Sequence, residues 1–212
     1  MDDKNIKMNL QLFVGAMGQP GGGQNDVTAR IIRHMSILAI DSFDDTTLKK
    51  IFTPIVDWHF GKEYESGILR WARPMVQSTM QVYKSAMSLF LPTPAKSHYV
   101  FNLRDFSRVI RGLLLVPPTH LKEPSKLMRL WVHEVYRVFY DRLVDDQDRQ
   151  TFFQLMSATV LENFKQDAQK LLGHLAPENK TLQDVHIRSL IFGDYMEPKA
   201  ETKIYDEVSP PD

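Results

Sequence analysis

The sequence of 212 residues is defined first by what it lacks. It has no cysteine, so disulfides and thiolate metal sites are excluded, and the composition suits a reducing compartment. The charges of its 26 basic and 26 acidic residues cancel, so no net positive charge favours binding to a nucleic acid or an anionic membrane. No apolar run approaches the roughly 20 residues that span a bilayer, and the start MDDKNIKMN is too acidic for a secretory signal. These absences predict a soluble intracellular protein with neither nucleic acid nor membrane as partner.

A glycine-rich stretch, LFVGAMGQPGGGQNDVTARIIRHMS, begins at Leu12 but lacks the residues of a phosphate-binding loop. No Lys-Ser or Lys-Thr pair follows the glycines, as the G-x-x-x-x-G-K-[ST] spacing requires. The dinucleotide fingerprint also fails, because Gly21 and Gly23 are followed by Asp26 at the third glycine position. The stretch is therefore interpreted as a connection from a strand to a helix, in which glycine supplies positive φ.

The segment HEVYR, which begins at His133, lacks the second ligand of a zinc site. A zinc-binding helix of this kind needs H-E-x-x-H, so that two imidazoles lie on one face. Arg137 stands at the second ligand position and would repel the ion. A metal hydrolase is excluded on this basis, and Glu134 with Arg137 is predicted to form a pair on the helix surface.

What the sequence does contain is an ordinary globular composition, with 43% hydrophobic and 25% charged residues. Short apolar runs bounded by turn residues predict buried strands at Leu10–Ala16 and Ile37–Ile40. Between them, Asp26 or Thr28 is placed to cap a short helix. Two strands do not form a stable sheet, since three or more with a covered face are needed. The chain is therefore expected to be truncated at its front.

From Asp44 onward, apolar residues recur at helical spacing, which predicts five helices. The second begins near Pro74, the third is capped by Asn102, and the last ends near Gly173. The fourth is predicted over Ser125–Val144 and the fifth over Gln147–Leu172. The expected inward residues are, helix by helix, Leu48, Ile51, Phe52, Ile55 and His59 or Phe60; Val76, Met80, Tyr83, Met87 and Phe90; Phe106, Val109, Ile110 and Leu113; Leu127, Trp131, Val135, Val138 and Leu143. The remainder predicts short extended segments that approach another domain.

Four segments carry a resemblance to one family. They are QLFVGAMGQPGGGQNDVTARIIRH from Gln11, KSHYVFNLRDFSRVIRGLLL from Lys96, RLWVHEVYRVFYDRLVDDQDRQTFF from Arg129 and IRSLIFGDYMEP from Ile187. Together they resemble, in register from about Leu10 to Val208, dynein heavy chains of the axonemal inner-arm kind. The resemblance implies the back part of the third AAA+ module of the motor ring and the start of the fourth, with the Walker A and Walker B segments upstream.

The implied fold is an incomplete α/β AAA+ module that is mainly helical. Residues 1–43 would contribute two or so strands of the large subdomain, together with the arginine-finger helix. Residues 44–175 would form the small, or lid, subdomain of about five helices. Residues 176–212 would connect into the next module.

The resemblance also assigns roles to individual residues. Gly18 stands at the tip of the sensor-1 strand, where many AAA+ modules have an asparagine, so a structural or regulatory nucleotide role is expected. Arg33 matches the arginine finger toward the neighbouring second module, with Arg30 one turn earlier as possible support. A planar guanidinium suits this task because it contacts phosphate oxygens in a bidentate manner. The alternative for a helix arginine is a solvated surface position.

Arg104, in FNLRDF, matches the sensor-2 arginine that reaches toward the γ-phosphate of its own module. The alternative is an ion pair with Asp105 or a relation to Arg108 on the same helix. Departures from the usual family pattern lie at Gln19, Gln24, Asp26 and Ala29, where relatives show Pro, Arg, Pro and Pro. They predict a looser loop and the loss of one charge near the phosphate path.

The implied function is ATP-linked conformational coupling in microtubule-based ciliary or flagellar movement, in the cytoskeleton of the axoneme. The implied partners are neighbouring AAA+ modules of the same heavy chain and, through the parent protein, other axonemal dynein subunits and microtubules. No cofactor is expected for the chain alone, whereas ATP or ADP with magnesium belongs to the intact ring. The alternative is a stand-alone helical interaction module, derived from dynein and without ATPase activity.

Overall fold

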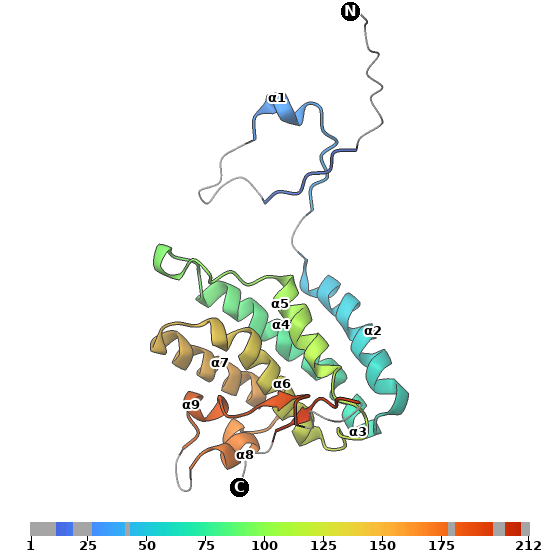
Figure 1. Ribbon diagram of the computed structural model, residues 1–212, viewed down its shortest axis with the longest axis vertical. Helices are drawn as coiled ribbons and strands as arrows, with labels where there is room; N and C mark the ends of the chain where they lie inside the picture. The colour runs from blue at the N-terminus through green and yellow to red at the C-terminus, as the bar shows by residue number, and fades with distance from the viewer. Residues whose placement is uncertain (1–11, 19–26, 41–42, 178–180, 197–201, 209–212) are drawn as a thin grey trace, which may run out of the picture. The chain divides into compact units, whose positions relative to one another are not determined.

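A computed structural model describes residues 12–18, 27–40, 43–177, 181–196 and 202–208 (Figure 1). The chain divides into two units, Met1–Ser42 and Phe43–Asp212. In the described part of the chain, no helix combines the length and the apolar character needed to cross a membrane.

The first unit contains one short helix, α1 (Ala29–Ile32), which begins after Thr28 as the sequence predicted. The predicted strands are wrong within the described residues, because 12–18 and 36–40 have no strand pairing. Their apolar side chains lie in solvent: Leu12 is 90% exposed and Leu38 is 88% exposed. The physical reason is that a strand exists only by pairing, and this unit supplies no neighbouring strand in the described residues. The rest of the glycine-rich stretch, residues 19–26, and the start of the first predicted strand lie outside the described residues.

The second unit is built from helices that pack around α4 (Ala72–Leu89), which contacts α2, α5 and α7 (Figure 1). A small antiparallel pair of strands completes it. In chain order the other elements are α2 (Asp45–Glu63), α3 (Ser66–Leu69), η1 (Pro94–Lys96), α5 (Leu103–Leu113), α6 (Pro124–Val138), η2 (Tyr140–Arg142), α7 (Asp146–Phe164), α8 (Ala168–Leu172), η3 (Gly173–Leu175), α9 (Asp184–Ile187), β1 (Phe192–Gly193) and β2 (Asp206–Glu207).

Two of the predicted helix faces need correction. In α2 the prediction of Ile51 and Ile55 as inward residues is wrong, since they are 40% and 43% exposed. The helix instead buries positions spaced by four, because its main neighbour, α4, covers a narrow stripe along one side. In α4, Met87 is likewise 38% exposed, although the rest of its predicted stripe is buried. The buried residues of α2 are Leu48, Phe52, Val56 and Phe60.

In helix α5 both the predicted cap and the predicted inward residues are confirmed. Asn102 is the N-cap, and its side-chain oxygen accepts a hydrogen bond from the backbone N–H of Arg104 at 2.9 Å. In return, Asp105 Oδ2 accepts a hydrogen bond from the backbone N–H of Asn102 at 3.0 Å. This reciprocal arrangement is a capping box, which satisfies two of the free donors at a helix start. The predicted inward residues Phe106, Val109, Ile110 and Leu113 are all buried.

The fourth and fifth predicted helices are longer than the helices that form in the structure. Helix α6 ends at Val138 rather than at Val144, and the turn η2 follows it. The predicted fifth helix is two helices, because Lys165 adopts a left-handed conformation (φ 55°) that ends α7. Asp167 then caps α8, accepting a bond from the backbone of Gln169 at 3.0 Å.

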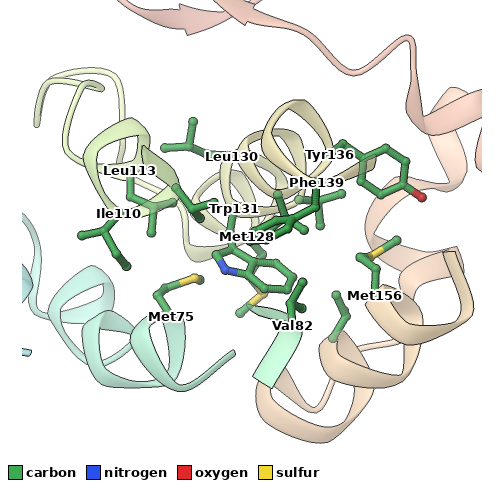
Figure 2. Packing of buried hydrophobic residues seen from close by; sticks show 14 of the residues in the cluster. Met75, Val82, Ile110, Leu113, Met128, Leu130, Trp131, Tyr136, Phe139 and Met156 are labelled. Atoms are coloured by element: carbon green, nitrogen blue, oxygen red, sulfur yellow. The ribbon is translucent and has the colours of Figure 1, made fainter. Parts of the chain in front are cut away.

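The core of the second unit is centred on Trp131 of α6, which is fully buried (Figure 2). Its indole Nε1 donates to Thr79 Oγ1 at 2.9 Å, and that hydroxyl donates to the carbonyl of Met75 at 2.8 Å. Both polar groups thereby have partners, which removes the cost of burying them. Met75 lies beside the indole with Met128 and Val82, as expected for methionines that fill an irregular core (Figure 2).

The C-terminal hairpin, β1 and β2, lies against α6 rather than apart from the helices (Figure 1). Glu207 receives two hydrogen bonds from Arg129, both of 2.8 Å. Asp206 pairs with Lys126 at 2.6 Å and with His120 at 2.7 Å. The sequence predicted extended segments here, and the structure adds that polar contacts to α6 and its preceding loop fix them.

Candidate functional site

The candidate site on the second unit is the first turn of α5, which presents Arg104. Arg104 is the second residue of the helix, and its side chain is exposed. Its backbone N–H is held by Asn102, so the direction in which the side chain leaves the helix is fixed locally. Among the described residues, no ion pair is formed by Arg104. A guanidinium placed in this way is available to an anionic ligand.

The predicted alternative, an ion pair between Arg104 and Asp105, does not form. Asp105 is 2% exposed and points the other way, because adjacent residues on a helix do not face one side. Its partners are Arg142, whose Nη1 lies 3.1 Å from Oδ2 and whose Nη2 contacts Oδ1, and Arg108, at 3.4 Å. Asp105 is therefore neutralised by other arginines.

The loop that enters α5 is held by a second charged cluster. The ammonium of Lys96 contacts Asp145 and lies 2.6 Å from Asp148, and these hydrogen bonds raise the pKa of Lys96. The hydroxyl of Tyr99 donates to Asp148 at 3.0 Å and accepts from the backbone N–H of Val144 at 2.9 Å. The loop is thereby tied to the residues that follow α6, which reinforces the position of α5.

The two other predicted arginines lie in the first unit. Arg30 is within α1, and Arg33 follows its last residue, where Nε donates to His34 Nε2 at 2.8 Å. Both side chains are exposed, as an arginine offered to another protein surface would be. Arg30 therefore lies on the short helix α1 and Arg33 directly after it, while Arg104 belongs to the other unit. Gly18 is exposed and has no regular secondary structure.

The predicted pair of Glu134 with Arg137 is wrong. Glu134 is 8% exposed and accepts a hydrogen bond from the hydroxyl of Tyr205 at 2.7 Å, while Arg137 pairs with Asp141 at 3.1 Å. Burial is the main cause that raises the pKa of Tyr205, and the bond to Glu134 adds to it. Within the residues that the structure covers, no group of three potential metal ligands is present.

The sequence did not predict the ion pair between Asp105 and Arg142. The N-x-x-D spacing of Asn102 and Asp105 is a capping-box signal that could have identified the carboxylate. Nothing in the sequence marks Arg142, because it lies 37 residues from Asp105 and its role depends on how α6 ends.

Comparisons with known proteins match this architecture. Residues 75–173 match the family model of the AAA+ lid domain, and residues 2–43 match that of the P-loop containing dynein motor region. The chain is 57% identical over 197 residues to dynein axonemal heavy chain 3 of Mus musculus and 56% identical over 208 residues to that of Homo sapiens. It is 44% identical over 203 residues to dynein axonemal heavy chain 12 of Rattus norvegicus.

These alignments cover 93%, 98% and 92% of the chain, in the same order. The chain spans only 5% to 6% of the length of these relatives. Nearly all of it therefore aligns with one short segment of much longer proteins. The chain belongs to the axonemal dynein heavy chain family, of which it carries an AAA+ lid domain and part of the dynein motor region.

Proposed function

We propose that the chain is the back part of the third AAA+ module of an axonemal dynein heavy chain of the inner-arm kind, leading into the fourth module. The order of the matched families supports a large-subdomain segment followed by its lid, since the motor-region segment precedes the lid along the chain. In this assignment residues 1–43 belong to the large subdomain, 44–175 form the lid, and 176–212 connect to the next module. The microtubule partners and the place in the cilium or flagellum follow from the parent protein.

The proposed function is to convert the nucleotide state of the module into rotation of the lid. One observation carries it: Arg104 is an exposed guanidinium, without an ion pair among the described residues, on a turn that is fixed by a capping box. A contact from Arg104 to a γ-phosphate exists only while that phosphate is bound, so it favours one lid position over another. Bound ATP would supply the phosphate that Arg104 detects.

The residues present fit one part of a nucleotide site. Arg104 suits a phosphate oxygen, whereas the described residues contain no cluster of three or more potential metal ligands and the 212 residues contain no G-x-x-x-x-G-K-[ST] motif. The β and γ phosphates and the magnesium ion would therefore be held by other parts of the heavy chain. For this reason the chain alone should not hydrolyse ATP above background.

Arg33 has a different proposed target, the nucleotide of the second module, with Arg30 in support. Its exposure at the C-terminal end of α1 supports an outward role. Arg33→Ala in a full-length heavy chain should therefore change nucleotide behaviour in the second module and leave that of the third unchanged. An effect confined to the third module would contradict the assignment.

Arg104→Ala in a full-length heavy chain tests the main proposal. A charge-assisted hydrogen bond contributes about 1.5 to 3 kcal/mol, so nucleotide affinity at the third module should fall by about tenfold or more. Arg111→Ala is a matched control, since it removes an exposed arginine from the last turn of the same helix. Unchanged nucleotide affinity and unchanged microtubule gliding velocity in Arg104→Ala would refute the role.

A further inference from the structure

Arg142 makes an extensive set of contacts with the segment that enters α5. Its guanidinium binds the buried carboxylate of Asp105 through two nitrogens, and Nη1 also donates to the carbonyl of Val100 at 3.1 Å. Cζ lies 5.4 Å from the ring centre of Phe101, and the backbone carbonyl of Arg142 lies 3.0 Å from His98 Nε2. One side chain thus touches three positions between Val100 and Asp105.

The two-pronged contact from the Arg142 guanidinium matters because Asp105 both accepts the capping hydrogen bond and binds Arg142. Its Oδ2 accepts the backbone N–H of Asn102 in the capping box, and the same oxygen receives Nη1 of Arg142. A planar guanidinium can bind both carboxylate oxygens at once and leave this bond intact, whereas an ammonium is a point charge. Arg108 does not replace it, since it offers one contact at 3.4 Å and is 58% exposed.

We propose that Arg142 is a positioning residue for Arg104. By binding both oxygens of Asp105, it fixes the first turn of α5 and neutralises the carboxylate next to Arg104, which leaves the Arg104 guanidinium available to a phosphate. This inference rests on the proposed sensor role of Arg104. It adds that the first turn of α5 is fixed from η2, the turn that follows α6, through a contact between residues 37 positions apart in the chain.

The test separates positioning from a general loss of stability. Removal of Arg142 would leave a buried, unpaired carboxylate and could unfold the unit, so the variant used is Arg142→Lys, which keeps the charge and loses the fork. The matched control is Arg108→Lys, which alters the weaker contact to the same carboxylate. A second variant, Asp105→Asn, keeps a capping oxygen and removes the charge that Arg142 binds.

The first measurement is amide hydrogen exchange in the 212-residue chain. Arg142→Lys and Asp105→Asn should speed exchange at the backbone amides of Asn102 and Arg104, while the protection of α7 stays unchanged. Arg108→Lys should exchange as the wild type does. Equal protection of the first turn of α5 in Arg142→Lys and the wild type would overturn the proposal, and so would loss of protection throughout the unit.

The second measurement is nucleotide affinity of the third module in full-length heavy chains. Arg142→Lys should cause a several-fold loss that is smaller than the loss in Arg104→Ala, and the effect should vanish when Arg104 is already alanine. An equal loss in both backgrounds would overturn the positioning role. If Arg104→Ala alone binds nucleotide normally, the sensor role is refuted and the purpose of Arg142 with it, while the exchange data still decide whether Arg142 fixes the turn.

Discussion

Gly112, in the last turn of α5, is a position where alanine should destabilise a helix that it would ordinarily stabilise. A Cβ added to Gly112 would lie 2.1 Å from both Cδ and Oε2 of Glu134 on the neighbouring helix α6. Glu134 is buried and its other oxygen, Oε1, accepts the hydrogen bond from Tyr205. The carboxylate therefore cannot move aside without weakening the hydrogen bond from Tyr205, one of the contacts that hold the C-terminal segment on α6.

The sizes of these opposing free energies decide whether Gly112→Ala stabilises or destabilises the protein. Alanine in place of glycine in a helix gains up to about 1 kcal/mol, whereas a hydrogen bond to a charged group contributes about 1.5 to 3 kcal/mol and overpacking costs about 1 to 3 kcal/mol. Gly112→Ala should thus lower the free energy of unfolding by roughly 1.5 to 5 kcal/mol on these values. Gly61→Ala in α2 is the matched control, since a Cβ there meets nothing within 4 Å. It should raise the free energy of unfolding by up to about 1 kcal/mol.

Equilibrium urea unfolding of the 212-residue chain, followed by the fluorescence of its tryptophans, measures both effects. Glu134→Ala gives a further test, because it removes the side chain that the new methyl would meet. In that background Gly112→Ala should become mildly stabilising, as Gly61→Ala is in the wild type. The reasoning is refuted if Gly112→Ala stabilises the wild-type chain, or if its cost is the same with and without the Glu134 side chain.

Three further predictions concern other parts of the chain. Thr79→Val should lower the free energy of unfolding by about 1 to 3 kcal/mol, because it leaves Trp131 Nε1 buried without an acceptor, and Thr79→Ser should lose less; urea unfolding that shows no difference between the two would contradict this. Burial raises the pKa of Asp206, but the hydrogen bonds from Lys126, His120 and the backbone of Glu207 together outweigh it, so the folded-state pKa is lowered from 3.8. The resulting stabilisation should be complete above pH 3.8 and disappear as the pH falls through the lower folded-state value, and an Asp206→Asn variant whose deficit in unfolding free energy persists unchanged at pH 2 would disprove it. Amides of residues 12–18 should exchange rapidly in hydrogen exchange, since the segment has no strand pairing, and slow exchange there in a monomer would show that it has found a partner.

Local signals in the sequence were reliable where local interactions decide the structure. Asn102 begins α5 because its side chain and that of Asp105 satisfy the first backbone donors, which requires only residues three apart. The inward face of α5 follows from helical spacing for the same reason. The exposed arginine of the candidate site was found through resemblance to a family, because neither composition nor spacing distinguishes Arg104 from Arg108 or Arg111.

The sequence by itself determined the helical character of residues 44–172, the capping of α5 and the absence of any phosphate-binding or zinc-binding motif, because these depend on residue type and short spacing. Only the tertiary structure decided that α2 buries Val56 rather than Ile51 and that Glu134 bonds Tyr205 rather than Arg137. It alone joined Arg142 to Asp105. The first of these depends on which side of α2 is covered by α4, and the other two on groups 71 and 37 residues away. Such partners are brought together by packing, and a local pattern in the sequence carries no record of them.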